Sequence, residues 1–354
     1  MTGKPSCGSG IQDIDFREDR CAGSAGGEDM PEQTLISFVI IAYNEEPTIA
    51  GAIASIRELH GLSDYELIVV DDGSRDNTAR IVADVAGEDS RVRLIRLERN
   101  RGRGYARRAG VSAARGELIA MIDADIVLPA DWLARTRAAL GGHDAVGGIA
   151  VPDGDVAYIY KRFRLTPRIV GGTATVAGSN GLFRRHVFDV ATFDAALREG
   201  EDSALNHDMK RLGLSCVTVP GLFVRHEEDK TLATSLRWLF DTGRGATRQL
   251  VRYRTVRQPD IVTGAFAGTA SLGLVLGLRR HRLLGAAVPT AFLLASGLQH
   301  VRSRFETPKS VWPRVTLAVV IDSAHLAAYF AGRLAGLTEL KPGRARDHVT
   351  TDER

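Results

Sequence analysis

The sequence has few of the residues that mark specialised protein classes. Its three cysteines, Cys7, Cys21 and Cys216, are scattered among 354 residues and form no CxxC pair. This excludes a disulfide-stapled scaffold and is typical of a reducing compartment. Neither sign of charge dominates, since 46 Lys and Arg oppose 43 Asp and Glu, so no nucleic-acid partner is expected. With 44% hydrophobic and 25% charged residues, the composition is that of a globular protein.

The first 34 residues lack an apolar core and are rich in Gly, Ser and acidic residues. They contain no basic start followed by an apolar stretch, so they do not resemble a signal peptide. We predict a disordered tail at 1–34, with ordered structure beginning at Leu35.

From Leu35 onward, apolar runs with strand character alternate with helical stretches. We expect strands at 35–43, 65–70, 92–97 and 117–122, and helices at 46–59, 77–86 and 104–114. Continuously apolar strands separated by helices indicate βαβ units, with a parallel sheet covered on both faces. The predicted fold class is therefore α/β. The stretch 143–230 is less regular, with a further helix expected from about Glu201 to Leu212.

Polar residues follow three of these strands directly: Tyr43-Asn44-Glu45, Asp71-Asp72-Gly73-Ser74 and Asp123-Ala124-Asp125. In open parallel sheets, ligands bind at the carboxyl ends of the strands. Two acidic residues at i and i+2 suit a hard divalent cation that is held partly by phosphate. Turn chemistry would explain one such segment, but three at one sheet edge predict a binding site.

Four segments, in order and spacing, resemble the family 2 glycosyltransferases of the GT-A fold: FVIIAYNEEPTI, VVDDGSRDNT, NRGRGYARRAG and MIDADIVLP. The resemblance covers roughly residues 36–228. It implies a GT-A domain at 35–230, which is Rossmann-like, with a mostly parallel sheet and helices on both faces. It also implies a nucleotide-diphosphate sugar as donor and Mn²⁺ or Mg²⁺ as cofactor.

The same motif matches assign residues to the donor site. The resemblance implies that the metal is held by Asp123 and Asp125 and that the nucleotide is bound by Ala42, Tyr43, Glu45, Asp71, Asp72, Arg107 and Asp123. Gly102 and Gly104 would also suit a dinucleotide fingerprint, but that motif needs a small residue where Arg107 stands.

An acidic pair, Glu201-Asp202, opens the helix expected at 201–212. Acidic residues in a first turn commonly offset the helix dipole. Beside the upstream segments, however, the pair resembles the family's catalytic "ED" motif, which implies Asp202 as the base with Glu201 next to it. A sugar hydroxyl is a weak nucleophile until a carboxylate takes its proton. One base without a second nucleophilic carboxylate implies direct displacement with inversion.

Two further segments match the family. AGSNGLFRR resembles the lining of the sugar and acceptor pocket, which implies roles for Gly178, Asn180 and Gly181. His226 matches a position that supplies a metal ligand in some members, although a lone His after a strand is more commonly a polar cap. Thr234 stands where processive synthases have Gln in Q-x-x-R-W, which favours addition of a single sugar.

The C-terminal third predicts membrane attachment. Residues 231–258 read as a basic amphipathic helix, with Arg237, Arg244, Arg248 and Arg252 along one flank. Three apolar runs, 261–278, 283–298 and 315–337, predict hydrophobic or transmembrane helices within 259–338, ahead of a polar tail at 339–354. A soluble helical bundle is the alternative. We expect the protein at the cell membrane, with its catalytic domain on the cytoplasmic side.

Together these observations predict an inverting, metal-dependent transferase. It would move one sugar from a nucleotide-sugar to a hydroxyl of a lipid-linked or cell-envelope saccharide. The alternative is a polyprenyl-phosphate sugar synthase, whose phosphate acceptor needs no base. A catalytically inactive binding protein on the same fold is a third hypothesis, disfavoured by the intact carboxylates.

Overall fold

The structure is a computed structural model. It describes residues 34–152, 176, 178–227 and 232–253, together with short helical pieces at 264–265, 268–269, 271–275, 287, 291, 324 and 327–338. The predicted tail, apart from Thr34, and most of the predicted apolar runs lie outside these residues.

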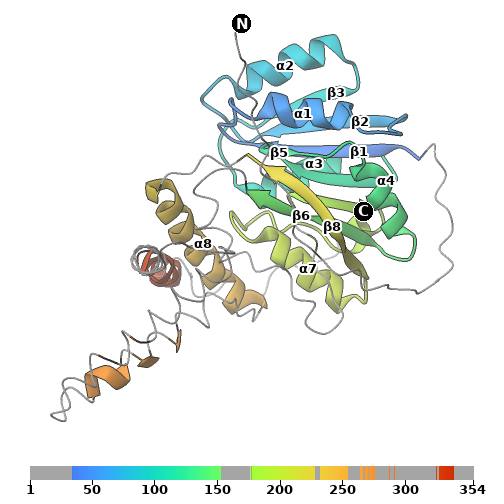
Figure 1. Cartoon of the computed structure of the whole chain (residues 1–354). Helices are drawn as coiled ribbons and strands as arrows, with labels where there is room; N and C mark the ends of the chain where they lie inside the picture. Colours follow the sequence, from blue (N-terminus) through green and yellow to red (C-terminus); the bar gives the residue numbers. More distant parts are fainter. Residues whose placement is uncertain are drawn as a thin grey trace, which may run out of the picture.

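One eight-stranded sheet forms the centre of the protein, with the strand order β3-β2-β1-β4-β7-β6-β8-β5 (Figure 1). The four strands expected from the sequence are β1 (Ile36–Ala42), β2 (Tyr65–Asp71), β3 (Val92–Arg96) and β4 (Leu118–Asp123). They are mutually parallel, which confirms the α/β prediction and brings their carboxyl ends to one edge.

The second half of the sheet is mixed. β7 (Asn180–Arg184) runs antiparallel to both β4 and β6 (Ala145–Pro152). The long strand β8 (Cys216–His226) is parallel to β6, and its end pairs with the two-residue strand β5 (Ile126–Val127). The pairing of β5 with β8 brings His226 next to the residues that follow β4.

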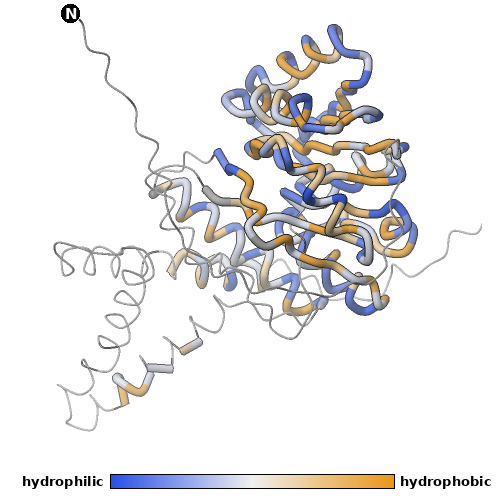
Figure 2. The backbone as a smooth tube through the Cα atoms, turned by 45° about the vertical axis from the view of Figure 1, so that its right-hand side comes forward, coloured by the Kyte–Doolittle hydropathy of each residue, from blue (hydrophilic) through white to orange (hydrophobic). Residues whose placement is uncertain are grey.

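Helices cover both faces of the sheet: α1 (Ile49–Arg57), α2 (Thr78–Glu88), α3 (Arg103–Ala113), α4 (Trp132–Leu140), the short α6 (Val187–Val190) and α7 (Glu201–Arg211). Alternate β1 side chains enter two separate cores. Phe38 and Ile40 pack in the core that contains α1 and α4 residues, whereas Val39 and Ile41 pack in the core that contains α3 and α7 residues. The apolar strand interiors stand out from their polar ends in Figure 2.

α8 (Leu232–Tyr253) occupies the stretch expected to be a basic amphipathic helix. It lies beside α7, outside the sheet (Figure 1). Residues 327–338 form a further helix that packs on α8, where Thr247 Oγ1 donates a hydrogen bond of 2.9 Å to the Arg333 carbonyl. In the part of the chain that the structure describes, no helix combines the length and apolarity needed to cross a membrane.

Candidate active site

The loops that follow β1 and β2 are tied to each other. The Asn44 amide donates to Ser74 Oγ (2.9 Å), and the Arg75 amide donates to Asn44 Oδ1 (2.9 Å). Asn44 has a φ of 57°, in the left-handed region that Asn tolerates better than most residues. The Glu45 amide is held by Thr78 Oγ1 at 2.8 Å. These bonds give the sheet edge a fixed wall.

A cavity of about 460 Å³ opens at the ends of β1, β2 and β3. Its lining residues are Tyr43, Gly73, Ser74, Arg75, Arg96, Leu97, Glu98, Arg99 and Asn100. The volume is within the range of small-molecule sites, and the exposed ring of Tyr43 offers a surface on which a base can stack. This cavity therefore suits the nucleoside half of a nucleotide ligand.

Asp71 and Asp72, by contrast, are engaged by the protein itself. Asp72 accepts hydrogen bonds from the amides of Arg101 (2.7 Å) and Gly102 (2.9 Å), while its own amide donates to the Ala42 carbonyl (2.8 Å). Asp71 Oδ1 accepts from the Ser74 amide at 2.9 Å, and Oδ2 lies 3.3 Å from Arg96 Nε. Burial raises the pKa of Asp72. In this structure the two carboxylates fix the loops around the cavity.

Three carboxylates and one imidazole gather next to this wall. Asp125 Oδ2 lies 2.7 Å from His226 Nε2, and the Asp125 carbonyl accepts a 2.7 Å hydrogen bond from the Glu227 amide. Burial, followed by the negative charge of Asp125, raises the pKa of Glu45 to about 7. Asp123 adds to this repulsion. Glu45, Asp123, Asp125 and His226 therefore form one acidic cluster.

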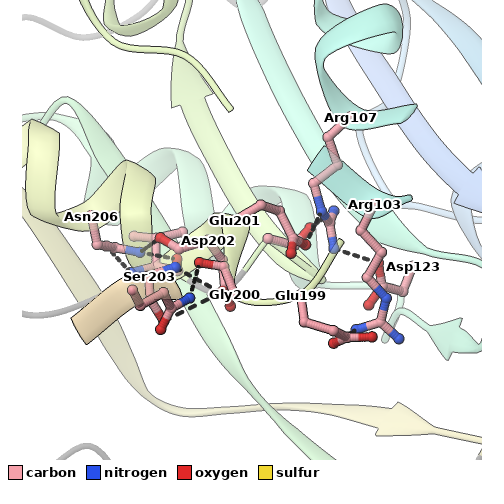
Figure 3. Close-up of polar contacts among 12 residues, drawn as sticks. Arg103, Arg107, Asp123, Glu199, Gly200, Glu201, Asp202, Ser203 and Asn206 are labelled. Carbon is pink, nitrogen blue, oxygen red and sulfur yellow. Dashed lines mark hydrogen bonds and ion pairs between the residues drawn. The ribbon is translucent and has the colours of Figure 1, made fainter. Parts of the chain in front are cut away.

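Arg107 connects this cluster to α7 (Figure 3). Its side chain is only 2% exposed, with Nη2 2.7 Å from Asp123 Oδ1 and Nε 2.9 Å from Glu201 Oε1, and Nη1 donates to the Gly178 carbonyl. Burial opposes ionisation of Asp123, but Arg107, Arg103 and His226 still hold the pKa of Asp123 below its ordinary value. The guanidinium thus neutralises carboxylates from two distant segments.

The two acidic residues at the start of α7 point in different directions (Figure 3). Glu201 is buried against Arg107, and burial raises its pKa. Asp202 is only partly buried, and its Oδ1 accepts from the Ser203 amide within the same turn (2.7 Å). Glu201 therefore anchors α7, whereas Asp202 retains access to a ligand.

The three residues expected in the sugar and acceptor pocket have separate environments. Gly178 contacts Arg107, and a Cβ there would lie 2.9 Å from the guanidinium carbon. Asn180 is fully buried in β7 and accepts a 2.7 Å hydrogen bond from Trp132 Nε1. Gly181 pairs with Met121 inside the sheet. Only Gly178 lies directly against the charged network.

Arg103 and Glu199 belong to the same network, although neither was predicted from the sequence as a site residue. Arg103 Nη1 lies 3.7 Å from Glu199 Oε2, and Glu199 followed by the cluster carboxylates raises the pKa of Arg103. Arg103 precedes Arg107 by one helical turn, so both side chains share a face of α3. The spacing of the two arginines could have been recognised in the sequence, whereas the role of Glu199 depends on how the chain folds.

The acidic cluster fits a divalent cation. Among the described residues, no three His, Cys, Asp or Glu side chains are already arranged as a metal site. However, Asp125 Oδ1 is buried and has no hydrogen-bond partner within the described part of the chain. Hard carboxylate oxygens are what Mg²⁺ and Mn²⁺ prefer, commonly with phosphate completing the coordination. Asp123 and Asp125 are thus the residues that would hold the ion.

A known protein family matches this part of the fold. The family is "Glycosyl transferase family 2", and the match spans residues 37–192, which contain the cavity wall, Arg107 and the acidic cluster apart from His226. Residues 37–192 are a family 2 glycosyltransferase domain. The succinoglycan biosynthesis protein ExoO of Rhizobium meliloti (strain 1021) is 36% identical over 223 residues, which are 57% of this chain and 63% of that protein.

A second relative is named for transfer that involves a lipid phosphate. The undecaprenyl-phosphate 4-deoxy-4-formamido-L-arabinose transferase of Enterobacter sp. (strain 638) is 35% identical over 164 residues, which are 44% of this chain and 50% of that protein. The chain thus spans between half and two thirds of the length of these curated relatives. The glycosyltransferase domain is shared, and the remainder of each protein lies outside the match.

A solved structure shows the same fold for the larger part of the chain. The mannosyltransferase PcManGT from Pyrobaculum calidifontis, in complex with GDP-Man and Mn²⁺, aligns with a TM-score of 0.56 and 18% identity. The alignment covers 90% of this chain and 92% of that chain. This likeness supports the GT-A prediction for the family 2 glycosyltransferase domain.

Proposed function

We propose that the protein transfers a single sugar from a nucleotide-diphosphate sugar to a hydroxyl of a lipid-linked or cell-envelope saccharide, with inversion. The observation that carries this proposal is the junction made by Arg107, which places the Asp123 end of β4 next to the Glu201-Asp202 start of α7. The nucleoside-sized cavity lies along the same sheet edge. A donor bound there would extend its diphosphate toward the acidic cluster and its sugar toward α7.

Each group then has a chemical task. Asp202, at the start of α7, takes the proton of the acceptor hydroxyl as the oxygen attacks the anomeric carbon. Arg107 and Glu201 fix the position of that helix start. When bound, a Mn²⁺ or Mg²⁺ ion supplies positive charge that stabilises the departing nucleoside diphosphate. With one base and no second carboxylate assigned as nucleophile, a single displacement inverts the anomeric configuration.

A polyprenyl-phosphate acceptor is the second candidate. The name of the Enterobacter relative specifies undecaprenyl-phosphate, and such an acceptor is already anionic, so it would need no base. The partly exposed Asp202 favours the hydroxyl acceptor, because a carboxylate placed against an incoming phosphate would repel it. The two candidates predict different consequences of removing the Asp202 charge.

The proposal extends to the membrane. α8 has exposed Leu250 and Val251, and the helix 327–338 that packs on it exposes Phe330, Leu334 and Leu337. Apolar residues beside an arginine-rich flank suit the surface of an anionic bilayer. We expect attachment to the cytoplasmic face of the cell membrane through this helix pair. The full-length chain should sediment with membranes, and recovery in the supernatant without detergent would contradict attachment.

The experiment that tests the catalytic proposal is a screen of nucleotide-sugars with purified full-length protein. Reactions should contain Mn²⁺ or Mg²⁺ and either a saccharide acceptor or a polyprenyl phosphate. We expect product with one donor, inversion at the anomeric carbon by NMR, and loss of turnover in excess EDTA. Full activity of an Asp123→Ala/Asp125→Ala variant in EDTA would contradict the assigned ion site. Transfer only to the polyprenyl phosphate would favour the second candidate.

A further inference from the structure

One face of α8 lies against the segment that leads into α7. Gln249 Nε2 donates a 2.5 Å hydrogen bond to the Gly200 carbonyl, and the Gln249 side chain is 1% exposed. Tyr253 donates to Asp194 Oδ2 at 3.1 Å, and Arg252 Nη1 lies 2.7 Å from the same oxygen. Gln249, Arg252 and Tyr253 are spaced so that they share one face of the helix.

Gly245 extends this face by one turn toward the start of α8. A Cβ at Gly245 would lie 2.8 Å from the Cβ of Glu199 and 3.1 Å from the Glu199 carbonyl oxygen. The α8 backbone therefore approaches residues 199–200 more closely than any side chain at position 245 would allow. Four residues of one helix face thus hold the stretch 194–200 at both of its ends.

Gly200 is the residue on which this contact converges. It is the N-cap of α7 and has a left-handed φ of 78°, which favours glycine. Its carbonyl accepts the first intrahelical bond, from the Ala204 amide at 3.1 Å, in addition to the bond from Gln249. No side chain caps α7 at this position. The bond from Gln249 therefore fixes the peptide two residues before Asp202.

The opposite face of α8 is clamped by the helix 327–338. A Cβ at Gly243 would collide with the backbone of Tyr329, and one at Gly332 would collide with the backbone of Phe240. Thr247 bonds to the Arg333 carbonyl on the same side. With 3.6 residues per turn, this side lies roughly half a turn from Gly245 and Gln249. α8 is therefore held between the C-terminal helix and the start of α7.

We propose that Gln249 is a positioning residue for Asp202, and that α8 is part of the catalytic unit as well as a surface for the membrane. The inference rests on the proposed function, because it assigns Gln249 an effect through the base. Removing the amide donor leaves the Gly200 peptide free to move, and Asp202 moves with it. Donor binding depends on the cavity at the ends of β1, β2 and β3, so the affinity for the donor stays unchanged.

The test is a double-mutant cycle in full-length protein with Gln249→Met and Asp202→Asn. Methionine keeps the approximate volume of glutamine but cannot donate. Because small misplacements of a catalytic group cost up to about 100-fold in rate, we expect Gln249→Met to lower kcat at least about 10-fold with donor KM within about twofold. In the Asp202→Asn background the same change should have almost no further effect, because the base is already absent.

Three further variants guard against a trivial loss of folding. Gly245→Ala forces α8 away from Glu199 without touching Gln249, and it should show the same selective loss of kcat. The matched controls are Gly87→Ala, where nothing lies within 4 Å of an added Cβ, and Arg80→Met at an exposed position of α2. Both controls should leave kcat unchanged, and circular dichroism should show all variants folded at the assay temperature.

The outcomes separate the two claims. If Asp202→Asn lowers kcat while Gln249→Met and Gly245→Ala do not, the positioning role is overturned and the proposed function stands. An equal loss from Gln249→Met in both backgrounds also overturns the positioning role, since the effect would not pass through Asp202. If Asp202→Asn itself leaves kcat unchanged, the base assignment and this inference both fail.

Discussion

Arg107 and Asp123 form an ion pair of 2.7 Å in which the arginine side chain is almost fully buried. The same guanidinium lies 2.9 Å from Glu201, so one cation joins the end of a central strand to the start of the helix that carries Asp202. A buried charge is stable only when it is paired. The active-site edge is therefore held together by charges that depend on one another.

Replacing Arg107 should destabilise the fold. Arg107→Met leaves Asp123 and Glu201 without their counter-charge, and breaking such a buried pair costs about 3–5 kcal/mol. Chemical denaturation should show this loss in the free energy of unfolding. The double variant Arg107→Met/Glu201→Met should recover part of it. Arg108→Met, at the exposed neighbouring position, is the matched control, and an equal loss there would refute the assignment.

Gly110 should tolerate no side chain. It lies in α3 against the sheet, where an added Cβ would overlap Val39 Cγ1 and lie 3.2 Å from Val70 Cγ2. Overpacking of this kind costs about 1–3 kcal/mol, more than the ~1 kcal/mol gained from helix propensity. We expect Gly110→Ala to lower the thermal midpoint, while Gly87→Ala, in open space on α2, raises it slightly. A stabilised Gly110→Ala protein would contradict the close helix-to-sheet contact.

The raised pKa of Glu45 predicts a pH-dependent stability in protein stripped of metal. A carboxyl with a pKa of 4.5 when unfolded and about 7 when folded favours the folded state below pH 4.5, and this contribution is lost as the pH rises through 7. Glu45→Gln should therefore be more stable than the wild type at pH 8, by up to about 3 kcal/mol. The difference should shrink toward pH 4.5.

The neighbouring Glu46 has a pKa shifted in the opposite direction, so its effect on stability should have the opposite pH dependence. Hydrogen bonds from Asn77 lower the pKa of Glu46, so its contribution is present above the unfolded pKa and is lost as the pH falls. Glu46→Gln should slightly destabilise the protein at neutral pH. Thermal midpoints measured in EDTA from about pH 3 to 8 compare the two variants, since the Glu46 contribution is lost only below its unfolded pKa. A parallel pH dependence would rule out the acidic cluster as the cause.

The parallel half of the fold was predictable because its signals are local. β1, β2 and β4 are largely apolar runs, and such runs directly predict strands buried on both faces. β3 was predictable from its three apolar residues, although it lies at the sheet edge and exposes Arg93 and Arg96. The antiparallel insertion of β7 was missed, because AGSNGLFRR contains two glycines and pairs with strands far away in the sequence. α4 was missed as well, although Trp132 anchors one of the two cores.

The sequence predicted which carboxylates would lie close together, but it did not predict which of them would be engaged by the protein itself. Acidic residues at strand ends predicted that carboxylates converge at one sheet edge, and the parallel strands bring them there. The sequence cannot, however, distinguish a carboxylate that binds a ligand from one that holds a loop. Asp72 bonds to amides about 30 residues away. Glu201 and Asp202 are adjacent, and only the position of Arg107 separates an anchoring residue from an accessible one. The Gln249 contact depends on how α8 packs.

The role of Asp202 as the base in transfer to a hydroxyl is tested by the Asp202→Asn variant. The measurement is kcat with a saccharide acceptor together with the donor dissociation constant, with Asp208→Asn on the same helix as control. We expect kcat to fall by about 10²–10⁴, with donor affinity unchanged within about twofold and with normal turnover of the control variant. Near-normal turnover of Asp202→Asn would contradict this role and favour an acceptor that is already anionic.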